Sequence, residues 1–264
     1  MNSSEINRYK RLIESSNVYD VALITPITKA NQLSKTLKNE ILLKREDLQP
    51  IFSFKVRGAY NKLAKLRQNG LTGPVIAASA GNHAQGVSFG AKNLGIKAYI
   101  VMPITTPSIK VDSVKNYGGK VILKGDNFDE AFKYAEELAK KENYTFIHPY
   151  DDRDVIAGQG TVGKELIEQI DNGMDVVFVP VGGGGLLAGL GSYIKSVNPK
   201  IKIIGVEPED AACLKLALDN NKRLSLAEVG LFADGVAVKQ IGKNTFSLIR
   251  QWIDDVITVS VDEM

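Results

Sequence analysis

Apolar and polar residues follow one another along this chain in blocks that predict strands and helices in turn. The continuous apolar run at 75–78 is typical of a strand buried on both faces in a parallel sheet, and the run at 176–181 is the strongest strand signal. The pattern predicts helices over 5–16, 29–37, 56–68, 83–94, 108–117, 127–143, 153–171, 186–197, 209–220 and 241–254, and strands over 41–45, 75–78, 98–102, 120–123, 145–147, 176–181, 201–206 and 256–259. This alternation predicts the α/β class, with parallel-rich sheets covered by helices.

The predicted units fall into two blocks, residues 51–150 and 151–264, which suggests two lobes with a cleft between them. Asn127, with Glu130 three residues later, predicts a capping box at the start of one helix. Residues 260–264 have the pattern of the first turn of a helix. We therefore expect the sequence to be part of a longer protein.

The composition narrows the function mainly by exclusion. Apolar residues make up 44% of the chain and charged residues 24%, with a formal net charge of +3. This charge is too small and dispersed to predict binding to nucleic acid, and no apolar run approaches the length of a membrane span. Cys213 is the only cysteine and the N-terminus has no signal pattern, so we expect a reducing, cytoplasmic location.

The segment Ser53–Ala59 places a lysine at the predicted start of a helix. Ser53 stands where an N-cap belongs, so Lys55 falls in the first turn, at the positive end of the helix dipole. A cation is disfavoured there, and we expect a lowered pKa for Lys55 and a nucleophilic amine. Such an amine forms a Schiff base with a carbonyl substrate or with pyridoxal phosphate. The alternative is an ordinary solvated surface lysine.

Four consecutive glycines, Gly182–Gly185, lie between the strongest predicted strand and an apolar helix. Glycines let the backbone approach a phosphate, and the free N–H groups at a helix start bind anions. One alternative is a flexible linker. Another is a dinucleotide fingerprint at Gly183–Ala188, with Glu207 as the ribose-binding acid, although that fingerprint ordinarily lies in the first strand–helix unit of a domain.

A second candidate anion site is Ser79–His83, between strand 75–78 and the next helix. Ligands bind at the carboxyl ends of parallel strands. Ser79 and Asn82 offer polar groups there, and Gly81 allows close approach of the backbone. A substrate carboxylate suits such a loop. The alternative is simple N-capping of the helix by one of the two polar side chains.

Together, the lysine segment, the Ser/Gly/Asn loop and the tetraglycine resemble the fold-type II family of pyridoxal-phosphate enzymes, and among them the biosynthetic threonine dehydratases. The resemblance covers essentially the whole chain and is carried by Lys44–Pro50, Ser53–Ala59, Ser79–Gly86, Ile156–Thr161, Pro180–Leu186 and Phe232–Val238. It implies a tryptophan synthase β-like architecture. The large lobe would comprise residues 1–50 and 151–264, and the small lobe residues 51–150.

The resemblance implies a role for each site residue. Lys55 would hold pyridoxal 5'-phosphate as a Schiff base and move protons at the substrate Cα. Phe54 would pack on the pyridine ring, Asn82 would bond its hydroxyl, and Gly235 would line its edge. The phosphate would be held by Gly182, Gly183, Gly184, Gly185 and Leu186. The substrate carboxylate would be bound by Ser79, Ala80, Gly81, Asn82 and His83.

The reaction implied by the resemblance is β-elimination of L-threonine to 2-oxobutanoate and ammonia, the first step of isoleucine biosynthesis. L-Serine would be a secondary substrate, giving pyruvate. Two alternatives stay open: an NAD(P)-dependent oxidoreductase using Gly183–Ala188, and a truncated chain that binds phosphate-bearing ligands without turnover.

Three departures from the family pattern qualify this reading. Serine racemases of the family carry a serine where this chain has Ala80, so we predict a dehydratase and poor racemisation. Some relatives bind a divalent ion at positions that here are Glu207, Ala211 and Cys213. A thiol replaces a hard oxygen ligand, and no His/Cys cluster has ligand spacing, so we predict no metal.

The resemblance also implies segments beyond Met264: one that meets the pyridine nitrogen, and a regulatory domain that binds isoleucine. We expect this chain to lack feedback inhibition, with its own activity uncertain. Missing terminal elements would expose a sheet edge and apolar surface, and we expect a homo-oligomer.

Overall fold

The computed structural model describes residues 3–171 and 173–264. The α-helices are α1 Ser3–Glu14, α2 Asn31–Leu37, α3 Lys55–Gln68, α4 Asn82–Asn93, α5 Ser108–Asn116, α6 Phe128–Glu142, α7 Arg153–Gln169, α8 Gly185–Val197, α9 Cys213–Asp219 and α10 Lys243–Ile249. The strands are β1 Ile27–Lys29, β2 Leu42–Lys44, β3 Val75–Ala78, β4 Ala98–Met102, β5 Lys120–Leu123, β6 Thr145–Phe146, β7 Val176–Pro180, β8 Lys202–Pro208 and β9 Asp255–Val259. The predicted α/β class is confirmed.

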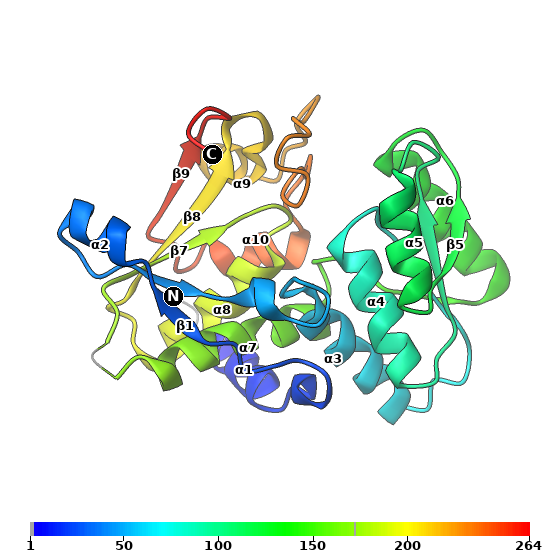
Figure 1. Ribbon diagram of the computed structural model, residues 1–264, viewed down its shortest axis with the longest axis horizontal. Helices are drawn as coiled ribbons and strands as arrows, with labels where there is room; N and C mark the ends of the chain where they lie inside the picture. Colours follow the sequence, from blue (N-terminus) through cyan, green and yellow to red (C-terminus); the bar gives the residue numbers. More distant parts are fainter. Residues whose placement is uncertain (1–2, 172) are drawn as a thin grey trace.

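One body of the molecule is built on a parallel four-stranded sheet in the order β5-β4-β3-β6. Successive side chains of a strand point to opposite faces. Val75 and Ala77 therefore pack with α3, α4 and α5, while Ile76 and Ala78 pack with α6. Helices on both faces explain why β3 is continuously apolar. In Figure 1 this sheet and α4–α6 occupy one end of the molecule.

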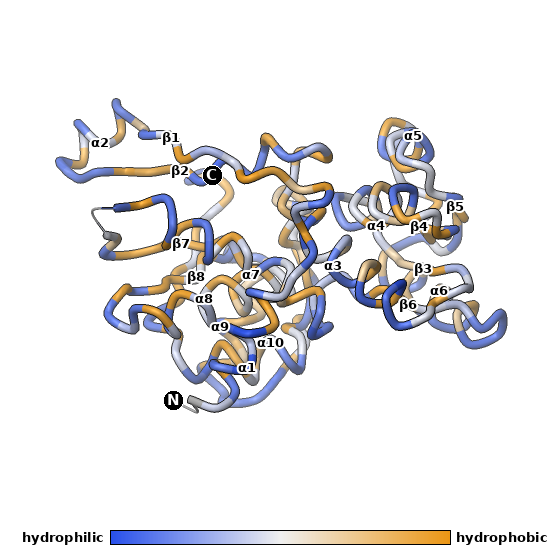
Figure 2. Tube along the Cα trace, turned by 90° about the horizontal axis from the view of Figure 1, so that it is seen from below, coloured by the Kyte–Doolittle hydropathy of each residue, from blue (hydrophilic) through white to orange (hydrophobic). Residues whose placement is uncertain are grey.

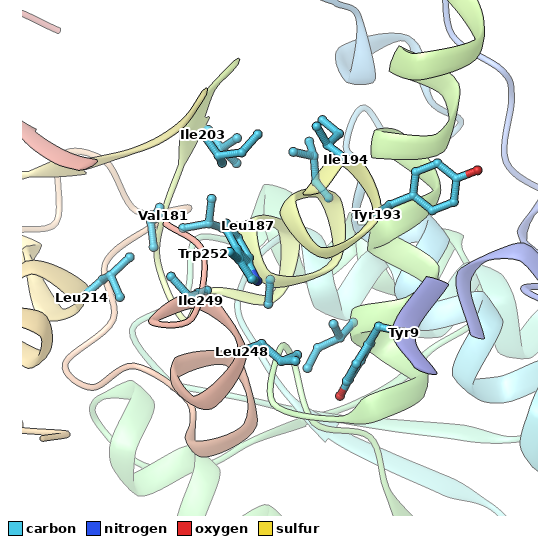
Figure 3. Packing of buried hydrophobic residues seen from close by; sticks show 14 of the residues in the cluster. Tyr9, Val181, Leu187, Tyr193, Ile194, Ile203, Leu214, Leu248, Ile249 and Trp252 are labelled. Atoms are coloured by element: carbon cyan, nitrogen blue, oxygen red, sulfur yellow. The ribbon is translucent and has the colours of Figure 1, made fainter. Parts of the chain in front are cut away.

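The other body is built on a parallel three-stranded sheet in the order β7-β8-β9. Its core joins α1, α7, α8 and α10 to the inner face of the sheet, and Leu187, Ile203 and Trp252 lie within it (Figure 3). β7 is apolar along its trace in Figure 2, yet it is an edge strand and Phe178 is 57% exposed. The strongest strand signal of the sequence thus belongs to a strand with one open face.

Helix α3 lies between the two bodies and crosses α7 (Figure 1). The crossing needs glycine on both helices. A Cβ built on Gly158 would lie 2.7 Å from the Arg57 carbonyl oxygen, and one built on Gly58 would lie 2.7 Å from the Val155 carbonyl oxygen. These distances are shorter than real Cβ contacts, so the close approach of α3 and α7 depends on both glycines.

Most predicted elements agree with the structure to within two residues, and two do not. The predicted helix 209–220 is broken into a 3₁₀ turn and α9, because Glu207 accepts hydrogen bonds from the Leu214 and Lys215 amides at the start of α9. The predicted helix 241–254 is shortened to α10. Beyond α10, Asp254 accepts a hydrogen bond from the Ile203 amide and the chain turns into β9.

Two further local features are an additional strand and a helix cap. Residues 27–29 form β1, which pairs antiparallel with β2 and was not predicted. The capping interaction predicted at Asn127 is confirmed, since its Oδ1 accepts from the Glu130 amide at 3.0 Å. The Glu130 carboxylate bonds back to the Asp126 amide, one residue before the predicted position.

Candidate functional site

Lys55 is the first residue of α3. The N-cap position is Phe54, so the expectation that Ser53 is the N-cap is wrong by one residue. Ser53 is nevertheless buried, and its hydroxyl accepts a hydrogen bond from the Lys55 amide at 3.3 Å. The serine therefore supports the helix start from one position further out.

The Lys55 amine is withdrawn from solvent. Its Nζ donates to the Pro149 carbonyl oxygen at 3.4 Å and lies 5.4 Å from the centre of the Phe54 ring. Burial disfavours the charged form and lowers the pKa of Lys55 to about 8. The predicted direction is confirmed, with desolvation as the cause in place of the helix dipole. The free amine is thus a larger fraction of Lys55 near neutral pH than of an ordinary lysine, and the surface-lysine alternative is wrong.

The loop after β3 presents free backbone amides. The N-cap of α4 is Gly81, and Ser79 accepts from the Gly81 amide at 3.1 Å, so neither Ser79 nor Asn82 caps the helix. Among the described residues, no acceptor meets the amides of Asn82, His83 or Ala84. These N–H groups form an anion site at a helix N-terminus.

Other side chains of this loop differ in what they offer. Asn82 is exposed and makes no side-chain hydrogen bond to the described residues. Ala80 packs its methyl group on the core beneath. The His83 ring is buried with Nε2 3.0 Å from the Ile147 carbonyl oxygen, and burial lowers its pKa to about 3. The His83 ring is therefore neutral at physiological pH, and its Nε2 already has a hydrogen-bond partner in the Ile147 carbonyl.

The tetraglycine loop forms the N-terminus of α8. Gly184 is the N-cap with φ +87°, a conformation that favours glycine. The first bond of the helix runs from the Ala188 amide to the Gly184 carbonyl at 2.8 Å, and within the described chain the amides of Gly185 and Leu186 meet no acceptor. The Gly183 carbonyl accepts from the Thr245 hydroxyl at 2.8 Å. This fixed loop excludes a flexible linker.

A segment that the sequence did not single out, residues 147–151, connects the three features. The Ile147 carbonyl meets the His83 ring and the Pro149 carbonyl meets Lys55 Nζ. The Tyr150 ring covers Gly183, where an added Cβ would lie 2.2 Å from ring carbon Cγ. Lys55 and both helix N-termini are therefore held around one short stretch of chain.

The Tyr150 hydroxyl has a structural partner and stays protonated. It donates to the Gln240 carbonyl oxygen at 3.4 Å, and burial raises its pKa to about 12. The next residue, Asp151, accepts from the Lys243, Asn244 and Thr245 amides at the start of α10. Residues 147–151 thus hold the start of α10 through Asp151 and contact Lys55 through the Pro149 carbonyl.

The remaining predicted cofactor residue, Gly235, lies in the loop that borders the tetraglycine. A Cβ built on Gly182 would lie 3.0 Å from Val236 Cα, which places the Gly235 segment beside this loop. A Cβ on Gly235 itself would meet no atom within 4 Å. There is open space at Gly235 for a ligand to approach.

Glu207 does not match the dinucleotide alternative. It is fully buried at the end of β8, and its two oxygens accept from the Leu214 amide at 2.8 Å and the Lys215 amide at 2.9 Å. A carboxylate engaged in this way is not free to bond a ribose. Cys213 donates its thiol to the Gly182 carbonyl at 3.5 Å, and burial raises its pKa to about 12, so the thiol stays protonated.

A buried charge network behind Lys55 was missed by sequence reasoning. Arg57 has no exposed side-chain surface and is bonded to Glu46 and Glu165. Lys44 also bonds Glu165, at 2.5 Å, so two cations and two anions balance. Burial alone would lower the pKa of Arg57, but the hydrogen bonds that it donates to both carboxylates outweigh burial and raise the pKa. The only sequence signal is that Arg57 falls among apolar helix positions.

Comparison with known proteins identifies the class. Residues 19–264 match the family described as pyridoxal-phosphate dependent enzyme, and the chain belongs to this family. It is 55% identical over 256 residues to the L-threonine dehydratase biosynthetic IlvA of Pasteurella multocida, covering 97% of this chain and 50% of that protein. The chain spans about half the length of the curated relatives it matches.

Solved structures show the same fold. The processed form of threonine deaminase isoform 2 from Solanum lycopersicum superposes with a TM-score of 0.95 at 47% identity, over 98% of this chain and 76% of that one. Maize serine racemase superposes with a TM-score of 0.90 at 31% identity, over 96% of this chain and 76% of that one. The tryptophan synthase β-like, fold-type II architecture is therefore confirmed, and these relatives lend no support to the oxidoreductase alternative.

Proposed function

We propose that this chain is the catalytic part of a pyridoxal-phosphate-dependent lyase that converts L-threonine to 2-oxobutanoate and ammonia, with L-serine as a secondary substrate. The observation that carries the proposal is the Lys55 amine, desolvated and held between two helix N-termini whose amides are free. The names of the relatives support threonine as the substrate and, with it, a place in isoleucine biosynthesis.

The residues present fit pyridoxal phosphate. Its phosphate suits the tetraglycine loop, because the amides of Gly185 and Leu186 lack acceptors and the helix dipole favours an anion there. Its aldehyde carbon suits the Lys55 amine. The ring would lie between these two points, with Phe54 against it, Gly235 at its edge and Asn82 as the partner of its hydroxyl.

The substrate carboxylate fits the second helix N-terminus. The amides of Asn82, His83 and Ala84 lack acceptors in the described chain, and Ser79 adds a hydroxyl. The buried imidazole of His83 is neutral and bonded to Ile147, so His83 would act through its backbone amide. Because the His83 ring is neutral, it would not offset the negative charge of the substrate carboxylate. The dipole of α4 would compensate that charge.

The chemistry requires a base at the substrate Cα and an exit for the β-hydroxyl. When bound, pyridoxal phosphate supplies an electron sink that stabilises negative charge at Cα. Lys55, with a pKa of about 8, takes the Cα proton as a free amine. The Cβ–O bond then breaks and the hydroxyl leaves with a proton as water. The released enamine takes up water and loses ammonia, so threonine is converted to 2-oxobutanoate and ammonia without net hydration.

Three properties of the wider protein belong to the same proposal. The two separate sheets support a small lobe of residues 51–150 and a large lobe of residues 1–50 and 151–264. The open edge of β7, with Phe178 exposed, supports a homo-oligomer. None of the helices in the described part of the chain is long and apolar enough to cross a membrane. A cytoplasmic location is part of the same proposal.

An absorption experiment tests the function. The purified chain is mixed with pyridoxal phosphate, and the visible band of the lysine-bound cofactor is recorded before and after L-threonine. Borohydride reduction and peptide mapping should place the cofactor on Lys55, and 2-oxobutanoate should accumulate. A folded chain that gives no band would overturn the cofactor assignment, and a band on Lys55 without product would overturn the proposed activity of this chain.

A further inference from the structure

Arg57 makes an unusual number of contacts for a side chain that does not face the site. Its Nε donates to Glu46 at 2.7 Å and its Nη2 to the other Glu46 oxygen at 2.8 Å. The same guanidinium donates to Glu165 through Nη1 at 2.5 Å and Nη2 at 2.9 Å. Arg57 is thus clamped on two sides by carboxylates, a geometry that its planar fork makes directional.

The clamp connects three separate parts of the chain. Glu46 precedes α3 and is itself fixed by the Thr25 hydroxyl at 2.6 Å. Glu165 belongs to α7 and also bonds Lys44. Thr161, one turn earlier in α7, accepts from Arg57 Nη1 at 3.1 Å. The guanidinium therefore ties the first turn of α3 both to the segment before it and to the neighbouring helix.

Lys55 and Arg57 are two residues apart in the first turn of α3. On a helix, two residues correspond to a rotation of about 200°, so the two side chains leave the axis on opposite sides. Lys55 reaches Pro149 on one side, and Arg57 reaches Glu165 on the other. Any rotation of the turn that relaxed the clamp would swing Lys55 Nζ away from its place.

We propose that Arg57 is a positioning residue for Lys55: its double clamp by Glu46 and Glu165 fixes the rotation of the first turn of α3, and with it the position of the Lys55 amine. This inference deepens the proposed function, because it concerns the same lysine. The glycine crossing at Gly58 and Gly158 fixes the separation of α3 and α7, and the clamp fixes the remaining rotation.

The test measures the Lys55 amine directly and needs no cofactor. The protein is labelled with trace acetic anhydride over a range of pH, and acetylation of Lys55 is followed by mass spectrometry. The wild-type midpoint is expected near pH 8. R57K keeps the charge but cannot bind two carboxylates in the same way. The Lys55 midpoint of this variant is expected to move towards the ordinary lysine value of 10.5, because the Lys55 amine moves out of its buried position.

A matched control separates positioning from general loss of stability. Lys195 is also buried and paired, with Asp254 at 2.7 Å, but lies in α8 and bonds to residues far from Lys55. K195M should lower the thermal midpoint and leave the Lys55 titration unchanged. T161V removes one hydrogen bond to Arg57 and should move the titration in the same direction as R57K, by less.

The outcomes are decisive in both directions. An unchanged Lys55 midpoint in folded R57K, or an equal change in K195M, would overturn the proposal. If R57K does not fold, an unchanged midpoint in T161V overturns it instead. A wild-type midpoint at the ordinary lysine value also overturns it. Failure of the proposed function would show separately, as absence of cofactor on Lys55 in the wild-type chain.

Discussion

The ring of Tyr150 packs on Gly183 with no room for a side chain between them. A Cβ on Gly183 would lie 2.2 Å from Cγ of the ring and 2.3 Å from two further ring carbons. The ring itself cannot retreat easily, because its hydroxyl is bonded to the Gln240 carbonyl and the residue is half-buried. Tyr150 thereby sets the shape of the proposed phosphate loop from beneath.

G183A is therefore expected to displace the loop or the ring. The overpacking should cost about 1–3 kcal/mol of unfolding free energy, measured by urea denaturation. It should also weaken binding of pyridoxal phosphate, measured by titration of the visible band. G73A is the matched control, because a Cβ on Gly73 meets no atom within 4 Å. Normal cofactor binding by G183A would contradict the assignment of this loop.

Replacement of Lys55 tests the central residue. K55A should remove the band of the lysine-bound cofactor and reduce 2-oxobutanoate formation by roughly 10²–10⁴-fold, the usual contribution of a positioned acid–base group. K65A is the control, because Lys65 belongs to the same helix but, among the residues that the structure describes, its amine bonds only the Ser15 carbonyl, at 3.1 Å. Retention of the band in K55A would mean that another lysine holds the cofactor.

The rate at which pyridoxal phosphate attaches should depend on pH through the Lys55 amine. Burial lowers the pKa of Lys55 to about 8, so the reactive free amine is the minor form below this pH and the major form above it. Attachment should rise about tenfold per pH unit well below the midpoint and level off above it. A rate that is still rising steeply between pH 9 and 10 would indicate an unperturbed lysine.

The same shift has a consequence for stability whose sign is fixed. Between about pH 8 and pH 10.5 the folded chain holds Lys55 neutral, whereas the unfolded chain keeps it protonated. The unfolded state therefore binds more protons in this window, and the contribution of Lys55 to stability rises with pH. The difference in urea midpoint between the wild type and K55M, measured at both ends of the window, isolates this contribution.

Local patterns in the sequence were enough to predict the loop after β3 and the glycine loop before α8. Each is an apolar strand followed by small residues and a helix, and the physics of free amides at a helix N-terminus is local. The position of Lys55 at the start of α3 follows from the same kind of local pattern. The strand β3 was predicted to the residue, because helices cover both of its faces and every position is apolar.

The Arg57 network could not be predicted, because its partners are distant in the chain. Glu46 is 11 residues away and Glu165 is 108 residues away, and an arginine in a helix is ordinarily exposed. The same limit applies to Tyr150, because its ring packs on Gly183, which lies in another part of the chain. Long-range contacts decide which charges are buried and which apolar strands, such as β7, stay at an edge.

Two ion pairs of the described chain connect the loop of residues 221–242 to helices α5 and α6. Lys239 pairs with Asp129 of α6 at 2.8 Å, and Lys110 of α5 pairs with Asp234, which precedes Gly235. Exposed pairs of this kind contribute little to stability, because solvent screens them. K239D should therefore raise hydrogen exchange in this loop and weaken cofactor binding by up to roughly fivefold.

A charge swap provides the control for this prediction. The double variant D129K/K239D restores opposite charges and should recover both measurements, and the effect of K239D should vanish near 1 M salt, where screening acts over about 3 Å. K115D breaks an exposed pair within α5, Lys115 with Asp112, and should change neither measurement. Failure of the double variant to recover would show that the charges do not hold the loop.

After proton removal, the substrate Cα can in principle take a proton back from either of its two faces. In the proposed mechanism Lys55 acts from one face of the substrate, and racemisation needs a second group that returns the proton from the other face. Ala80 has only a methyl group, packed on the core, and the buried His83 ring is neutral and bonded to Ile147. With L-serine, the chain should therefore form pyruvate and almost no D-serine, although maize serine racemase has the same fold. Chiral chromatography of the reaction, alongside a pyruvate assay, measures both products. D-Serine at a rate comparable to pyruvate would require another proton donor on the far face and would contradict the assignment of Lys55 as the sole acid–base group.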